Sequence, residues 1–310
     1  MDHAIYGTTA PHMKGKMRTD RIMRYIILAL LPSGIFGVLS YGFHAALLIA
    51  VTCASAIVTQ ILFELITKKP LAVKDCRILL NGLLVSYCLP PTVEWQIGAL
   101  GGAICALLME LSLHFFQRNI VSPIIFTRLI LMWIFPEELS LYMIDGLTMA
   151  TPLAALKEGQ SVDTLYMILG KTGGCIGEAS VLLLCLGAIF LIAMEIIDFR
   201  VSGMYLFSFA AFMAVFGGEG LSSYYLTAHL AGGGFMLALW FIAPAYSTLP
   251  MTRRGRLIYG VVLGVFTGIS RLYGPAPENL CYALLAANLF VPMIESISQS
   301  LPFGIEKGKL

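Results

Sequence analysis

Charged side chains are scarce in this sequence. Only 12% of its 310 residues are Asp, Glu, Lys or Arg, whereas 58% are hydrophobic. A soluble domain of this length carries roughly twice that charged fraction. The composition therefore excludes an ordinary soluble protein and indicates a chain that crosses a membrane several times.

Three further features are missing. The seven cysteines, at 53, 76, 88, 105, 175, 185 and 281, form no Cys-x-x-Cys pair or Cys/His cluster, so no metal site is predicted and they are expected to serve packing. No basic stripe with interleaved aromatics is present, so nucleic acid is not an expected partner. A cleavable signal peptide is not expected, because Met1 to Arg24 is polar and basic.

Long apolar segments are what the sequence has instead. About ten are found, and most approach the roughly 20 residues that a helix needs to span a bilayer. Ile78–Pro91 is shorter and contains Asn81-Gly82 and Pro90-Pro91, which predicts a half-helix or broken span. The segments are Ile22–Ser40, Phe43–Ile66, Ile78–Pro91, Ile97–Phe116, Ile120–Phe135, Ile176–Ile197, Val201–Phe216, Tyr225–Ala245, Leu257–Ile269 and Leu280–Ile294.

The positions of Lys and Arg predict an orientation. If the crossings alternate from a cytoplasmic N-terminus, sixteen of the 20 basic residues face the cytoplasm and Arg128 lies within a span. Only Lys157, Lys171 and Arg271 face outward. This bias follows the positive-inside rule, so both termini are expected in the cytoplasm and the loop around residue 151 outside it.

The expected fold is an all-α polytopic membrane protein with an inverted repeat of five plus five segments. Asn81-Gly82 and Leu89-Pro90 resemble Gly233-Gly234 and Ala243-Pro244 in the second half. The expected divisions are a cytoplasmic segment 1–21, a membrane half 22–135, an extracytoplasmic loop 136–175, a second membrane half 176–296 and a cytoplasmic tail 297–310.

The most informative stretch lies in that loop and reads Asp145-Gly-Leu-Thr-Met-Ala-Thr-Pro-Leu153. Asp-Gly predicts a turn. Thr151 followed by Pro152 predicts an N-cap with proline at the first helical position, and Lys157-Glu158-Gly159 is expected to end that short helix. A capped surface helix is the plain interpretation of these residues.

The same stretch resembles the flavin-attachment site of the family formed by the D subunits of the Rnf ferredoxin:NAD oxidoreductase and the B subunits of the sodium-translocating NADH:quinone reductase. The resemblance implies FMN joined to Thr151 by a phosphoester bond, with Asp145, Gly146, Thr148, Ala150 and Pro152 completing the motif. Met149 departs from the small residue usual at the motif centre. A phosphate on Thr151 would face the free N–H groups of the helix that follows.

A second hallmark of the same family begins at Gly173. The stretch Gly173-Gly174-Cys175-Ile176-Gly177-Glu178-Ala179-Ser180 resembles Gly-Gly-Ser-Ile-Gly-Glu-Thr-Ser, with Cys175 and Ala179 as departures. Without the resemblance it reads as a glycine-rich helix entry with an acid in its first turn. The resemblance implies that Gly173, Gly174, Gly177, Glu178 and Ser180 contact a flavin.

Weaker matches continue along nearly the whole chain. They are Lys74-Asp75, Asn119-x-x-x-Pro123, Gly255-Arg-Leu-Ile-Tyr-Gly260 and Asn288…Val291-Pro292. In the eighth segment, Gly232-Gly-Gly-Phe235 and Ile242-Ala243-Pro244 replace Gly-Ala-Thr-Met and Thr-Asp-Pro, so a carboxylate that relatives carry is missing. Among charges inside spans, Glu110 and Arg128 are candidates for either a structural pair or a proton or cation relay.

The function implied by the resemblance is a flavin-carrying membrane subunit of a redox-driven, ion-translocating complex, without independent catalysis or catalytic side chains of its own. The implied cofactors are covalent FMN and a non-covalent riboflavin. The implied partners are the other Rnf-type subunits, with their iron–sulfur and flavin carriers, a flavin transferase, and the lipid of a prokaryotic cell (inner) membrane. Two alternatives stay open: the quinone-reductase B subunit, which usually has a longer N-terminal extension, and a solute channel or transporter.

Overall fold

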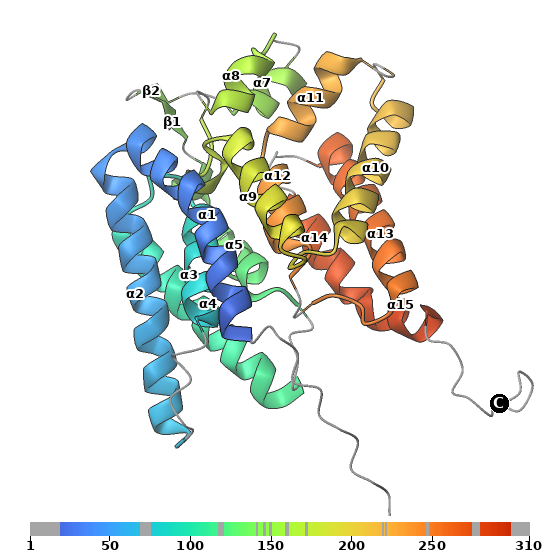
Figure 1. Ribbon diagram of the computed structural model, residues 1–310. Coiled ribbons are helices and arrows are strands. Elements are labelled where there is room, and N and C mark those ends of the chain that lie inside the picture. The colour runs from blue at the N-terminus through green and yellow to red at the C-terminus, as the bar shows by residue number, and fades with distance from the viewer. Residues whose placement is uncertain are drawn as a thin grey trace, which may run out of the picture.

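The computed structural model describes residues 19–68, 76–116, 121–140, 142–144, 147–148, 151–158, 161–170, 173–218, 220, 222–245, 248–274 and 280–298. Within these ranges the fold is almost entirely helical (Figure 1). A single pair of two-residue strands is the exception in the described part. The predicted all-α class is confirmed.

Among the described residues, five helices are long and apolar enough to cross a membrane, and three shorter apolar helices accompany them. Two bent helix pairs complete the set, with bends of 68° and 42°. These elements coincide in order with the ten apolar segments of the sequence. The long helices are α1 (Thr19–Tyr41), α2 (Phe43–Ile66), α4 (Trp95–Phe116), α10 (Phe199–Phe216) and α13 (Arg253–Tyr273); the short ones are α3 (Arg77–Tyr87), α5 (Pro123–Ile134) and α9 (Val181–Ala193); the bent pairs are α11 (Ser223–Ala231) with α12 (Phe235–Leu237) and η3 (Ala238–Ile242), and α14 (Leu280–Leu289) with α15 (Val291–Ser298).

The polar interval between the halves forms several small elements. They are α6 (Pro136–Ser140), the strands β1 (Met143–Ile144) and β2 (Leu147–Thr148), α7 (Pro152–Lys157), α8 (Thr164–Leu169) and the 3-10 turn η2 (Ile176–Glu178). The strands pair antiparallel, with Ile144 opposite Leu147. Figure 1 shows α7, α8 and the strand pair gathered at one end, whereas α15 and the start of α1 lie toward the other.

Helix packing repeats between the two halves. The most extensive helix contacts among the described elements are those of α2 with α4 and of α10 with α13, which are the second and fourth segments of each half. Equivalent segments also meet across the halves, because α1 packs on α9 and α5 packs on α14. This arrangement agrees with the predicted repeat and places the largest apolar core between the halves.

Two glycine sites that the sequence treats as equivalent differ in the structure. At Gly233 and Gly234 the backbone adopts φ of 58° and 71°, left-handed values that glycine tolerates, and the helix breaks there as expected. Asn81 and Gly82, in contrast, lie inside the continuous helix α3. A Cβ on Gly82 would lie 3.3 Å from Cys53 Cα, so this glycine permits close packing of α3 on α2 rather than a break.

The predicted orientation can be tested with two single-cysteine variants. Ser161 and Arg254 are both exposed, and they lie in the loop and at the start of α13 respectively. We expect a membrane-impermeant maleimide added to intact cells to label Ser161→Cys, and to label Arg254→Cys only after the membrane is permeabilised. The parent chain provides the background, since its seven native cysteines are all buried or partly buried. The reverse labelling pattern would show that the orientation is inverted.

Candidate functional site

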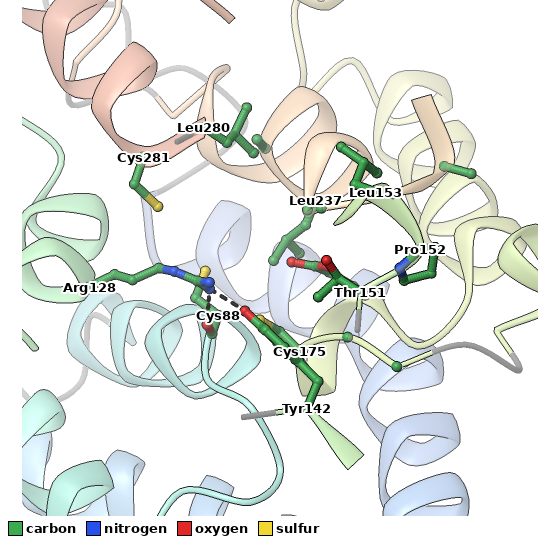
Figure 2. A pocket seen from close by; sticks show the side chains of 18 of the residues that line it. Cys88, Arg128, Tyr142, Thr151, Pro152, Leu153, Cys175, Leu237, Leu280 and Cys281 are labelled. Carbon is green, nitrogen blue, oxygen red and sulfur yellow. Dashed lines mark hydrogen bonds between the residues drawn. The ribbon is translucent and has the colours of Figure 1, made fainter. Parts of the chain in front are cut away.

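One pocket brings together segments that lie far apart in the sequence (Figure 2). It is formed by the end of α3, by α5, by the start of α7, by the turn before α9, by the break between α11 and α12, and by α14. Ligand sites in membrane proteins with internal repeats occur at such broken helices between the halves. The residues that line it are Cys88, Ile125, Arg128, Tyr142, Thr151, Pro152, Leu153, Met167, Gly173, Gly174, Cys175, Glu178, Ala231, Gly232, Gly233, Gly234, Leu237, Ala238, Ile242, Leu280, Cys281 and Leu284.

Thr151 is held at the wall of this pocket by the helix that it begins. Its Oγ1 accepts a hydrogen bond from the backbone N–H of Ala154 at 3.3 Å, and Pro152 occupies the first helical position, as the sequence predicts. Leu153 anchors the same turn, because it is buried against Met167 and Ala228. The hydroxyl therefore has a fixed position beside the cavity.

The second motif is divided between the pocket and the packing behind it. Gly173, Gly174 and Glu178 line the cavity. Gly177 lies behind the wall, where a Cβ would lie 2.7 Å from Tyr87 Cγ and where Ser33 Oγ donates to the Gly177 carbonyl at 2.9 Å. Ser180 is buried at the N-cap of α9.

Part of the first motif falls beyond the described ranges. Asp145, Gly146 and Ala150 lie outside the described residues, and for Thr148 the structure gives only the backbone, in strand β2. The strand pair flanks positions 145 and 146.

Arg128 of α5 is a buried charge on the pocket wall, with only 7% of its surface exposed. Its Nη1 donates to the Cys88 carbonyl and, at 3.2 Å, to Cys175 Sγ. The Nε–H is buried and has no partner within the described part of the chain. These two contacts of the side chain therefore lie at the pocket, and the pairing with Glu110 or a relay through the two residues stays a prediction.

Arg271 stabilises the helix break beside the pocket. It is 1% exposed within α13, and its Nη2 donates to the carbonyls of Gly232 at 2.8 Å and Gly233 at 3.0 Å. These carbonyls lose their helical partners at the break, and an orphaned carbonyl inside a membrane is costly. A Cβ on Gly233 would lie 2.6 Å from Nη1, so glycine is needed for this approach. The sequence interpretation, which counted Arg271 only as an outward-facing loop cation, misses this role.

Among the described residues, the charged side chains at and next to the pocket are one carboxylate and three cations: Arg128 and Glu178 line it, and Arg271 and Lys157 lie nearby. Glu178 packs against Gly234, where a Cβ would lie 2.5 Å from Oε1, and it interacts electrostatically with both Arg128 and Arg271. At the end of α7, partial burial and then the charge of Arg271 lower the pKa of Lys157, whose ammonium donates to the Gly274 carbonyl at 2.7 Å. One carboxylate thus faces two buried guanidinium groups, which makes the pocket suited to an anionic or carbonyl-bearing guest.

The family assignment rests on a match that covers nearly the whole sequence. The profile of the NQR2, RnfD, RnfE family matches residues 7–304. The chain belongs to this family.

Three similar proteins are named as D subunits of oxidoreductase complexes. The chain is 32% identical to the D subunit of the Na(+)-translocating ferredoxin:NAD(+) oxidoreductase complex of Acetobacterium woodii, with 97% of this chain and 96% of that protein covered. It is 31% identical, over the same shares, to the D subunit of the proton-translocating ferredoxin:NAD(+) oxidoreductase complex of Clostridium ljungdahlii. The D subunit of the ion-translocating oxidoreductase complex of Stutzerimonas stutzeri is 30% identical, with 92% of each chain covered.

The volume of the pocket and its hydrogen-bonding groups can be compared with those that a flavin site requires. The enclosed space is about 60 Å³, whereas sites that bury a whole drug-sized ligand measure roughly 300–1,000 Å³. The enclosed space therefore has room for one edge of a ring system and not for a whole flavin. The unpartnered Nε–H of Arg128 and the glycine backbone at Gly232 to Gly234, which lines the cavity, suit the carbonyl-rich edge of such a ring. Ala243, where the resemblance leads us to expect a carboxylate, is buried and apolar.

Proposed function

We propose that this chain is the flavin-carrying D subunit of an ion-translocating ferredoxin:NAD oxidoreductase complex, with FMN joined through its phosphate to Thr151 Oγ1. Its partners in this proposal are the other Rnf-type subunits, and a flavin transferase attaches the FMN. The FMN would accept electrons from one carrier and pass them to the next. The observation that carries the proposal is that Thr151 of the first motif and Gly173, Gly174 and Glu178 of the second line the same cavity.

The full-length similarity supports this proposal over the alternatives. The A. woodii and C. ljungdahlii relatives, both D subunits, match the chain over 97% of its length. A quinone-reductase B subunit remains the alternative within the family, because the matching profile includes NQR2. The two relatives are named for Na+ and for protons at nearly equal identity, so the proposal covers translocation of either cation.

The chain's own residues would bind and position the FMN. Thr151 fixes one end of the molecule, because its backbone is held by the Ala154 cap and by buried Leu153. A covalent tether prevents loss of the cofactor and keeps its ring near the pocket at a high effective concentration. The apolar walls at Leu237, Leu280 and Leu284 would exclude water from the enclosed edge.

A second cavity supports the riboflavin part of the proposal. It encloses about 370 Å³ near the starts of α3 and α5 and beyond the end of η3, and it is lined by Arg77, Asn81, Met109, Pro123 and Pro244, among others. Its volume lies within the range of small-molecule sites. We propose that this cavity holds the non-covalent riboflavin.

The covalent FMN can be tested on the wild-type chain. After co-expression with a flavin transferase, we expect a fluorescent band at the position of this protein on a denaturing gel, with equimolar FMN. Mass spectrometry of the peptide that contains Thr151 should show the added mass of FMN less one water. The matched control is the same chain expressed without the transferase, which should be dark. A dark wild-type band in the presence of an active transferase would contradict the proposal and favour the transporter alternative.

A further inference from the structure

The unpartnered N–H of Arg128 marks a place where the pocket is incomplete. The large majority of buried side-chain polar atoms in proteins have a hydrogen-bond partner. A buried donor without one costs free energy, and a charged donor costs more. Arg128 is also a charged residue inside a span, where such residues are rare and functional. Its Nε–H therefore indicates an acceptor that the described part of the chain does not supply.

Because Arg128 lines the pocket, the cavity is the space next to its guanidinium group that such an acceptor could fill. Figure 2 shows the guanidinium end of Arg128 and the side chain of Thr151 approaching the cavity from opposite sides. The bonds of Nη1 to the Cys88 carbonyl and to Cys175 Sγ fix the guanidinium plane. Because these bonds come from the ends of two other elements, the Nε donor is held in place before any guest arrives.

The charge balance indicates that this acceptor carries negative charge. Arg128 and Arg271 are both buried, and Glu178 is the carboxylate that interacts with both of them. A buried cation without a full counter-charge is strongly unfavourable. Arg271 lies behind the Gly233 backbone, whereas Arg128 lines the cavity directly. Arg128 is thus the cation that an anionic guest would contact.

We infer that Arg128 binds the pyrimidine edge of the Thr151-linked flavin, at N1 and the C2 carbonyl, and that its charge stabilises the reduced flavin as an anion. This inference rests on the proposed attachment of FMN to Thr151. The enclosed space of about 60 Å³ has room for one ring edge, and Arg128 is a cation that lines it. Arg128 is in this assignment a cofactor-binding residue that sets the reduction potential.

Reduction of the bound flavin adds two electrons and one proton. The electrons derive from a low-potential iron–sulfur carrier of the ferredoxin class, and the proton comes from solvent and is added at N5 of the oxidised isoalloxazine. The product carries one negative charge, spread over N1 and the C2 oxygen. A neighbouring guanidinium favours this product over the neutral oxidised ring, and charge near N1 is a recognised means by which proteins tune flavins.

The test is a redox titration of the covalent flavin in the purified full-length chain. We expect Arg128→Gln to lower the equilibrium constant for reduction of the flavin at least tenfold. This corresponds to a fall in midpoint potential of about 30 mV for a two-electron couple. Arg128→Lys keeps the charge and should recover most of the loss. Arg200→Gln, which alters an exposed arginine of α10, should titrate like the wild type. A flavin-loaded Arg128→Gln chain with the wild-type potential would overturn the inference.

A second measurement needs no variant and decides the case if Arg128→Gln does not load FMN. A flavin that takes up as many protons as electrons shifts its potential by about 59 mV per pH unit, and one that takes up half as many shifts by about 30 mV. We expect the smaller slope for the wild-type chain at mildly acidic pH, where free reduced flavin becomes neutral. The larger slope would refute the anion. If the wild-type chain carries no covalent FMN at all, the proposed function fails instead.

Discussion

Thr151→Val is expected to abolish covalent flavin on this chain while leaving the chain folded. Valine has nearly the shape of threonine but has no oxygen to form a phosphoester. The local loss is the cap to the Ala154 N–H, worth about 1 kcal/mol. Pro152 at the first helical position and buried Leu153 continue to hold α7 in place. In-gel fluorescence of the denatured band, normalised to protein, measures the result.

Two matched variants separate the roles of the hydroxyl groups in this motif. Thr148→Val removes a hydroxyl three residues away, in strand β2, and should retain full fluorescence. Thr151→Ser keeps an oxygen at the attachment position and should retain a measurable part of the signal. Fluorescence lost in Thr148→Val but kept in Thr151→Val would move the attachment to position 148. That outcome would leave the family assignment intact and replace Thr151 in the proposed function.

The sequence predicts the helical content well because membrane spans obey a simple rule. A span must bury its backbone polar groups in its own hydrogen bonds and present apolar side chains to lipid, so length and hydropathy identify it. All ten apolar segments correspond to helices or bent helix pairs in the structure. The N-cap at Thr151 is equally predictable, because capping depends on residues adjacent in sequence.

The same local reasoning does not distinguish two uses of glycine. Gly82 and Gly233 both follow a pattern that suggests a break, but Gly82 gives α3 room to pack on α2. Gly233 needs its left-handed φ, and a cation from another span stabilises the break by donating hydrogen bonds to two carbonyls. That cation is Arg271, which is distant in sequence. Its role therefore depends on tertiary packing, and hydropathy or charge counting does not reveal it.

The site is predictable only in part for a related reason. Thr151, Gly174 and Glu178 could be proposed from motifs that each lie within one stretch. The meeting of those stretches with Arg128 depends on how α5, α9 and the α11–α12 break pack together. Arg128 carries a sequence signal, since it is a charge inside a span. The hydrogen-bond partners of Arg128 have no such signal in the sequence, because no motif specifies the Cys88 carbonyl or the Cys175 thiol.

Replacing Gly102 or Gly264 with alanine is expected to destabilise the chain severely. Each lies on the fourth segment of its half and faces the backbone of the second segment. A Cβ on Gly102 would overlap the Thr52 carbonyl oxygen of α2, and one on Gly264 would lie 2.6 Å from the Phe209 backbone nitrogen of α10. Backbone atoms cannot turn away as side chains do, so the paired helices must separate and lose packing along their length.

Overpacking of this kind costs about 1–3 kcal/mol or more for each variant. Gly203→Ala in α10 is the matched control, because its new Cβ would lie 3.1 Å from a ring atom of Phe199 and can be accommodated by a small shift. Alanine also favours a helix over glycine by about 0.5–1 kcal/mol, so this variant should be as stable as the wild type. Thermal unfolding of the detergent-solubilised protein, followed by size-exclusion chromatography, measures all three. Equal melting temperatures for Gly102→Ala, Gly264→Ala and Gly203→Ala would contradict this prediction. They would show that the α2–α4 and α10–α13 contacts have room for an added methyl group.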